Sequence, residues 1–393
     1  MKSAIIHGAL LVLMLGYGYR TWTADKAVTA TSGNVVLWNK AVTEFTAIEF
    51  TSESPNSSRV TKLERRSDAG GSYVWGTEIT TTKRPKPVAP VAPVVAAGSG
   101  SGAAVGSGAA TVPPPPAPEL ETVVTTQQFP VGEAGDKLVA AVTKARALRD
   151  LGALTDSNKK DYKLDDSKTT FAIQFAAERR TFVIGGAVFG GADRYAMEAG
   201  SQRGYVLSKD LLQAVDSGKI SLQLADPRGF DNAKLYRVTV TAAGKFATRA
   251  KIVAKLTANA KGASASWGDP ATNKVDETMA NFVDKAATLR PSEYQPELKI
   301  SDLTEVVNFS YADQKGSPLG TLTLYKRSRA AAPPVQSATV AGAALTTAVP
   351  PAAPTPTMIT EYFIVTPKTR VPGLVATEAA KTTENDLATV FGQ

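Results

Sequence analysis

The sequence predicts an α+β protein, a tandem duplication of antiparallel-sheet-plus-helix units preceded by an N-terminal transmembrane helix. Three observations lead to this prediction: an apolar segment at the start, two low-complexity stretches, and a repeated order of strand and helix patterns. The predicted parts are residues 1–22 for the membrane segment, 34–220 for the first repeat and 231–393 for the second. A chain of 393 residues is long enough for two domains that each bury a core.

The N-terminal segment begins with Lys2, is apolar over residues 4–19 and closes at Arg20. This length is near the lower limit of about 17 residues for a membrane-spanning helix, and Trp22 lies where an interfacial aromatic residue anchors such a helix. A cleaved signal peptide has the same charged start and apolar middle and is the alternative. Both interpretations place the bulk of the chain outside the cytoplasm. The anchored form predicts a single-pass inner-membrane protein in contact with lipid, with a periplasmic body.

Composition excludes several classes of function. The net charge is +8, from 44 basic and 36 acidic residues, but the basic pairs are scattered, so we expect no nucleic-acid partner. The chain has no cysteine, and its one histidine, His7, lies in the N-terminal apolar segment. Disulfides, thiol catalysis, cysteine-ligated metals and histidine-based triads are therefore excluded. We expect no catalytic, cofactor-binding or metal-binding residues.

Two low-complexity inserts interrupt the predicted repeats. Residues 83–118 are rich in proline, alanine, glycine and serine, and residues 329–356 have a similar alanine- and proline-rich character. Such segments cannot build a packed core. Each resembles an insertion that loops out between two strands, which costs a domain little entropy.

The duplication begins with three strand patterns in each half. They are expected at residues 45–51, 59–65 and 72–76, and again at residues 236–241, 248–255 and 264–268. Both series end in a Trp-Gly pair, at Trp75 and Trp267, and we expect both tryptophans to lie in a core.

A helix is predicted next in each half. Asp136 and Asp276 are expected to cap these helices, and their closing residues, 144–149 and 285–290, are similar. Gly152 and Pro291 are expected to end them.

The remaining elements also correspond. Alternating strands are expected at residues 171–175 and 307–311, at 181–184 and 320–325, and around Tyr195 and Tyr362. Each half then ends in a short strand and a helix, at residues 205–215 and 374–390. The alternation predicts antiparallel sheets with one face covered by helices.

Three groups of residues are of types that can carry chemistry. The glycine-rich loop 184–194 has the backbone of an anion cradle, with Arg194 beside it, but lacks the lysine, the hydroxyl residue and the helix of a phosphate loop. A hairpin connection is favoured for it. The carboxylate clusters Asp161/Asp165/Asp166 and Asp226/Asp231 are interpreted as turn residues. The pairs Ser167-Lys168 and Ser208-Lys209 are too common to indicate a Ser/Lys dyad.

The layout resembles a family of membrane-anchored proteins that carry domain of unknown function 4340 (DUF4340). The resemblance depends on an early tryptophan, Trp38, after the apolar segment, and on the strand–strand–Trp–helix unit ending in Ala-x-x-Leu-Arg. It also depends on the glycine loop that leads into Arg194-Tyr195 and then Tyr205-Val206-Leu207. The long inserts depart from the family pattern. The resemblance implies an extracytoplasmic accessory subunit beside ABC transporters of the gliding-motility or exported-auxiliary type, and it supplies no catalytic residues.

The leading hypothesis is a non-enzymatic, envelope-anchored interaction module whose partner is a transporter permease or another envelope protein. The alternatives are an extracytoplasmic ligand-binding module with a cleft between the repeats near residues 226–232, and a structural surface protein. An envelope enzyme that uses carboxylates alone is a further alternative.

Overall fold

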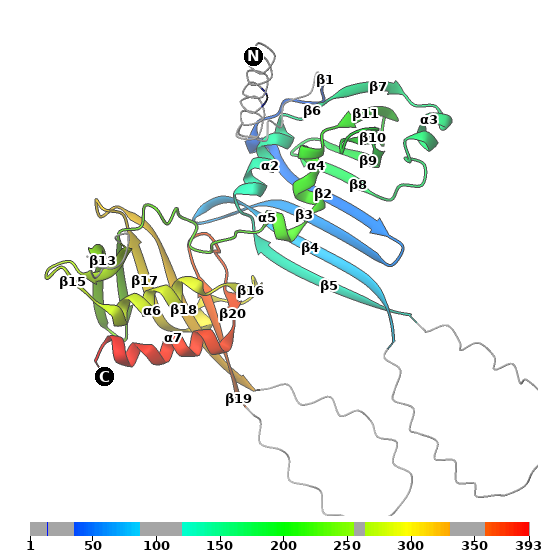
Figure 1. Ribbon diagram of the computed structural model, residues 1–393. Helices are drawn as coiled ribbons and strands as arrows, with labels where there is room; N and C mark the ends of the chain where they lie inside the picture. The colour runs from blue at the N-terminus through cyan, green and yellow to red at the C-terminus, as the bar shows by residue number, and fades with distance from the viewer. Residues whose placement is uncertain (1–13, 15–34, 87–119, 255–263, 331–357, 393) are drawn as a thin grey trace, which may run out of the picture. The chain divides into compact units, whose positions relative to one another are not determined.

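The computed structural model describes residue 14 and residues 35–86, 120–254, 264–330 and 358–392 (Figure 1). The predicted membrane segment therefore lies outside the described residues, apart from Met14. Within the described part of the chain, no helix has both the length and the apolar character needed to cross a bilayer.

The described residues are mainly β, with 49% in strands and 22% in helices. The prediction of an α+β class is therefore wrong, and no described helix supplies the transmembrane helix that the prediction included. The described residues form two nine-stranded sheets and one two-stranded sheet, in which strands such as β10 and β11, β12 and β17, and β2 and β3 pair antiparallel. The helical share is smaller than expected because most helices are short, and part of the first predicted helix pairs as strand.

The first large sheet has the strand order β5-β4-β3-β2-β8-β9-β10-β11-β7. Its strands are β2 (Phe45–Ser54), β3 (Ser57–Asp68), β4 (Gly71–Pro85), β5 (Leu120–Pro130), β7 (Arg149–Ala153), β8 (Thr170–Phe175), β9 (Arg179–Ala187), β10 (Arg194–Glu198) and β11 (Arg203–Leu207). The associated helices are η1 (Val42–Glu44), α2 (Glu133–Thr143), α3 (Asp156–Asp161), α4 (Lys209–Asp216) and α5 (Lys219–Leu222). A separate pair joins β1 (Val35–Val36) to β6 (Arg146–Ala147).

The second large sheet has the order β15-β14-β13-β12-β17-β18-β19-β20-β16. Its strands are β12 (Arg237–Ala242), β13 (Lys245–Ala254), β14 (Ser264–Asp269), β15 (Lys274–Val275), β16 (Pro291–Tyr294), β17 (Thr304–Ala312), β18 (Pro318–Ala330), β19 (Met358–Val365) and β20 (Gly373–Val375). Its helices are η2 (Ile300–Asp302), α6 (Glu277–Thr288) and α7 (Thr377–Val390), and Figure 1 shows α6 and α7 side by side on one face. Counted in chain order, the strands of the two sheets are arranged identically. We call each sheet with its helices a repeat.

Both inserts interrupt hairpins, as the sequence predicts. The first lies between the neighbouring strands β4 and β5, and the second lies between β18 and β19, which pair up to Ala330 and Met358. The residues of the inserts themselves, 87–119 and 331–357, lie outside the described part of the chain.

The first predicted helix differs most from expectation. Helix α2 begins at Glu133, so Asp136 lies inside it and is not its cap, and the helix ends at Thr143. Residues 144–149 do not close a helix, because Arg146 and Ala147 pair with β1 and Leu148 N–H donates to Val206 O. Gly152 lies in β7 with a φ of 72°, so it does not end a helix either. Long-range strand pairing overrides the local helical pattern here.

The second predicted helix is confirmed. The Asp276 side chain caps α6 by accepting the Met279 N–H at 2.9 Å, and Pro291 begins β16 after the helix has ended. One face of α6 packs Met279, Phe282 and Val283 into the core of the second sheet.

The tryptophans are buried as expected, with exposed fractions of 1% at Trp75, 6% at Trp267 and 7% at Trp38. The compact units nevertheless do not coincide with the two repeats along the chain. The second unit takes in Arg65–Thr77 and Thr126–Glu133 together with Leu222–Gln393. Inside that unit, Trp75 contacts Tyr294 edge-on with ring centroids 6.0 Å apart, whereas Trp267 lies in the hydrophobic core of the second sheet.

The predicted equivalence of Tyr195 in the first repeat and Tyr362 in the second is wrong by one residue. Ala196 lies opposite Ile184, and Tyr362 lies opposite Lys326, at the equivalent place in the second sheet. Ala196 and Tyr362 are both buried, whereas Tyr195 stacks on Tyr162 with centroids 4.1 Å apart. Tyr195 is next to Ala196 in β10, where the register is irregular between Arg194 and Ala196, and neighbouring residues of a strand point to opposite faces.

Candidate functional site

In each repeat one end of the sheet carries the insert and several hairpin turns, and we call it the insert end. In the first repeat it is formed by the β2–β3 turn, the β4–β5 insert, the start of β8 and the β9–β10 loop. The register places them together, since Thr170 at the start of β8 pairs with both Thr51 and Val183, and Lys83 N–H donates to Asn56 O at 2.9 Å. In the second repeat the β12–β13 turn, the start of β17 and the β18–β19 insert occupy the equivalent end.

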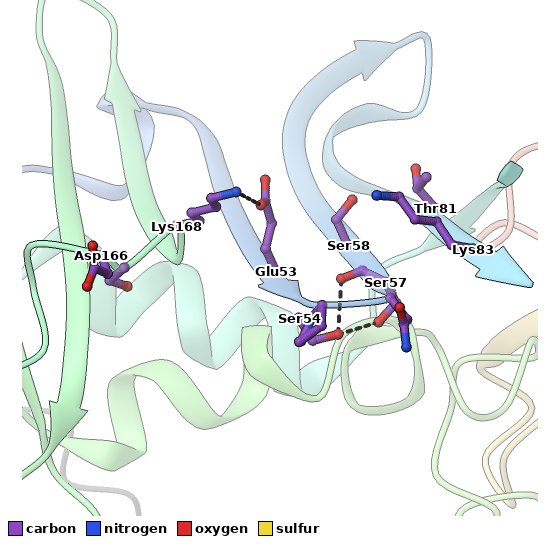
Figure 2. A pocket seen from close by; sticks show the side chains of 11 residues that line it. Glu53, Ser54, Ser57, Ser58, Thr81, Lys83, Asp166 and Lys168 are labelled. Carbon is purple, nitrogen blue, oxygen red and sulfur yellow. Dashed lines mark hydrogen bonds and ion pairs between the residues drawn. The ribbon is translucent and has the colours of Figure 1, made fainter. Parts of the chain in front are cut away.

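A shallow hollow of about 560 Å³ opens at the insert end of the first repeat (Figure 2). Its walls are polar, and they come from the β2–β3 turn, the end of β4 and the residues before β8. Figure 2 shows Lys168 turned toward Glu53, with Nζ 3.5 Å from Oε2, and Lys83 beside Thr81 on another wall. Ser54 and Ser57 join their hydroxyls at 2.7 Å across the turn. The lining therefore carries both positive and negative side chains, so neither sign of charge dominates the hollow.

Ser167 and Lys168 do not form a nucleophilic dyad. The Ser167 hydroxyl donates to Ile184 O and accepts the Thr169 N–H at 3.2 Å, so its proton is committed to the backbone. The Lys168 amine is paired with Glu53 and largely exposed. Ser208 instead caps α4 by accepting the Asp210 N–H at 3.2 Å, while Lys209 N–H donates to Asp193. Both pairs serve local structure.

The glycine-rich loop is a hairpin connection, as the sequence predicts. It joins β9 to β10, Val188 N–H donates to Asp193 O at 2.8 Å, and Gly190 has a φ of 74°. Gly185 is required for a different reason, because a Cβ atom there would lie 2.3 Å from Tyr162 O. The Arg194 guanidinium donates to Gly185 O at 3.4 Å.

The tip of this hairpin exposes Phe189 completely, at 101%. In the second repeat Phe246 follows the β12–β13 turn and is 74% exposed. Each repeat thus presents one bulky aromatic side chain at its insert end. Sequence reasoning had not identified either residue, although a phenylalanine next to glycines in a hairpin tip is a signal for it.

A second hollow of about 460 Å³ lies at the insert end of the second repeat, beside the C-terminal half of α7. Its polar centre is Glu384, which accepts hydrogen bonds from Lys326 and from the Tyr362 hydroxyl, the latter at 2.6 Å. Burial alone raises the pKa of Glu384, but the hydrogen bonds from Lys326 and Tyr362 outweigh it and lower the pKa. Burial, followed by the contact with Glu384, raises the pKa of Tyr362 to about 12. The carboxylate is therefore ionised and the phenol protonated near neutral pH, so neither is poised for proton transfer.

The first repeat has the equivalent hollow, of about 270 Å³, between α4 and its sheet. Phe171 pairs with Phe182 in the first repeat, and Val307 pairs with Leu324 at the equivalent place in the second. Ile184 and Lys326 each lie two residues beyond the second member of these pairs, so they occupy equivalent positions. Counted from the helix caps Ser208 and Ala376, Asp216 occupies the position of Glu384. Asp216 pairs with Arg59 at 3.8 Å. Each repeat thus has a hollow at the equivalent place, but the residues that line the two hollows differ in chemistry.

The predicted carboxylate clusters do not converge on a site. Asp161, Asp165 and Asp166 are exposed. Asp226 shapes a turn, accepting the Arg228 N–H at 3.0 Å, and its carboxylate also holds the Arg228 guanidinium. Arg228 is 7% exposed, and its guanidinium lies near the rings of Phe230 and Tyr311, 5.5 and 5.9 Å from their centroids. Among the described residues, no group of histidine, cysteine or acidic side chains is arranged to hold a metal.

Comparison with known proteins returned no match: no family model, no curated protein and no solved structure is similar to this chain. The resemblance to DUF4340 proteins therefore stays a prediction, as does a ligand cleft between the repeats.

Proposed function

We propose that this protein is a non-enzymatic interaction module of the cell envelope that works outside the cytoplasm and binds a protein partner through the insert ends of its repeats. The observation that carries this proposal is the pair of exposed aromatic side chains, Phe189 and Phe246, on hairpins at equivalent ends of the two sheets.

A single exposed apolar residue on a surface needs no explanation. Two fully or largely exposed phenylalanines, one in or beside a hairpin turn at the insert end of each repeat, are a stronger observation. Aromatic side chains are enriched in protein–protein interfaces, where they supply a large buried area for few rotatable bonds. Hairpin tips also present them without disturbing the sheet behind.

The location and the partner follow from the sequence. The apolar N-terminal segment supports export, as an anchor or a signal, and the DUF4340 resemblance supports a transporter permease as the partner class. The composition supports a role without catalysis, because the only histidine lies in that segment and cysteine is absent.

The test is a crosslinking pull-down of the full-length protein from gently solubilised membranes, with mass spectrometry of the captured proteins and of the bait's N-terminus. We expect a membrane partner, and we expect its recovery to fall at least tenfold in the double variant Phe189→Ser/Phe246→Ser. Val42→Ser is the matched control, since Val42 is 45% exposed and lies just before β2, at the opposite end of the first sheet.

Equal recovery of the partner by the double variant and the control would refute the insert ends as the binding surface. Recovery of the protein from the cytosolic fraction, without partners, would refute the proposed location as well.

A further inference from the structure

The two large sheets have four edge strands, and one of them differs from the rest. Strand β5 has 11 residues, whereas β7 has 5, β16 has 4 and β15 has 2. Strand β7 also carries Arg149, Asp150 and the left-handed Gly152, and β16 begins with a proline. Natural sheets protect their edges with charge, proline or shortness, and these three strands are protected in that way.

Strand β5 has these protections only at its ends, where Glu121 is charged and Pro130 closes the strand and accepts the Leu224 N–H at 2.9 Å. Residues 122–128 (TVVTTQQ) contain no charge, proline or glycine, and five of the seven are threonine or valine. Leu120 is 55% and Val124 is 60% exposed, on the same side of the strand. Figure 1 shows β5 at the rim of its sheet beside β4, and within the described part of the chain no strand pairs with its outer side. We call this outer side the β5 edge.

We propose that two copies of this chain associate through their β5 edges, which pair antiparallel about a two-fold axis at Val124 and join two nine-stranded sheets into one. The inference is independent of the location and the partner proposed above.

The strand is complementary to itself in this arrangement. With the axis at Val124, that residue faces its own copy, Thr122 faces Thr126, and Glu121 faces Gln127. Glu121 is the one charged residue of β5, and it is already paired with Arg84 on the neighbouring strand. Equal charges are therefore not brought together, and β-branched residues meet at the centre, which is the pairing that favours sheets. A two-fold axis makes the contact closed, so the result is a dimer and not a fibre.

The first experiment measures the mass of the full chain, gently solubilised, across a range of concentrations by light scattering after gel filtration. We expect a dimer, and we expect Val124→Lys to weaken it at least tenfold, because two ammonium groups then meet at the axis. Val275→Lys is the matched control, since Val275 is an exposed valine on β15, the short edge strand of the other sheet.

The second experiment uses the absence of cysteine, so that one introduced thiol is the only one present. Under mild oxidation Val124→Cys should give a covalent dimer in high yield. Phe246→Cys should not, although Phe246 is more exposed. Because valine and cysteine are similar in size, this variant tests the proposal even if Val124→Lys fails to fold.

A monomer at every concentration, a dimer that Val124→Lys leaves intact, or equal crosslinking at positions 124 and 246 would each overturn the proposal. So would a monomer that dimerises only after residues 87–119 are deleted, because the chain itself would then cover the edge.

Discussion

The two repeats share one strand order but place their inserts in different hairpins. In the first repeat the insert separates β4 from β5, where the second repeat joins β14 to β15 across residues 270–273. In the second repeat the insert separates β18 from β19, where the first repeat has the short glycine-rich loop between β9 and β10. The strand order is therefore determined by pairing between strands and not by the length of the connections, as the slow growth of loop-closure entropy allows.

The repeats also differ in what their shared positions contain. Where the second repeat holds Lys326 and Glu384 against Tyr362, the first has Ile184, Asp216 and Ala196. The longer helix α7 contacts its sheet through a partly exposed polar network beside the larger hollow, while the shorter α4 lies beside the smaller one. The duplicated fold thus preserves geometry while the chemistry of each copy has changed.

The largest expected effect tests whether the two copies are stable independently. Phe171→Ala in β8 and Phe309→Ala in β17 each remove a fully buried ring from one sheet and should lower the free energy of unfolding by ~3–5 kcal/mol. Hydrogen exchange resolved along the sequence should show the loss only in the mutated unit. Equal loss of protection in both units would show that they unfold together.

The next effect concerns the helix cap present in the second repeat. Asp276→Ala removes the side chain that accepts the Met279 N–H and pairs with Arg249 at 2.7 Å, and should cost ~1–2 kcal/mol of unfolding free energy. Asp276→Asn keeps the capping oxygen and should recover most of that loss in denaturant titrations. If asparagine is no better than alanine, the ion pair and not the cap stabilises α6.

A smaller effect should distinguish the polar network of the second repeat by its pH dependence. The folded state lowers the pKa of Glu384, so its contribution is present above the carboxyl's ordinary value of 4.5 and is lost as pH falls through the folded pKa. The unfolding free energy of the wild type should exceed that of Glu384→Gln by less than about 1 kcal/mol at pH 7, because the Lys326–Glu384 pair is partly exposed. The gap in melting temperature should close on acidification below pH ~4.5. A gap that is constant with pH would contradict the linkage.

The smallest effect is expected at the exposed phenylalanines. Phe189→Ser and Phe246→Ser should each change the unfolding free energy by less than about 0.5 kcal/mol, because neither ring is buried. Thermal melts of the two single variants, each compared with the wild type, measure these changes. A loss above 1 kcal/mol at either site would mean that the ring packs against the protein and is unavailable to a partner.

Much of the local structure was predictable from the sequence. The strands at residues 45–51 and 236–241, the cap at Asp276 and the burial of Trp75 and Trp267 were all expected and are observed. These features depend on alternation, capping chemistry and side-chain size, which a short stretch of sequence contains. Two features were not predictable: the hydrogen bond from the Ser167 hydroxyl to Ile184 O and the ionised state of Glu384 beside Lys326. In both cases the partner is distant in the sequence.

By itself the sequence determined which residues alternate as strands, where hairpins accept the two inserts, and which kinds of catalysis are excluded by the lack of cysteine and the single histidine. The tertiary structure alone decided that the fold is mainly β and that helix α2 stops at Thr143. It also decided that Ala196, and not Tyr195, is the residue equivalent to Tyr362. The reason is physical: a helix or a turn is stabilised by contacts within a few residues, whereas a strand is completed only by partners far along the chain. Residues 144–149 have a helical pattern, yet Arg146 and Ala147 pair with β1 and Arg149 pairs with β11 as strand residues.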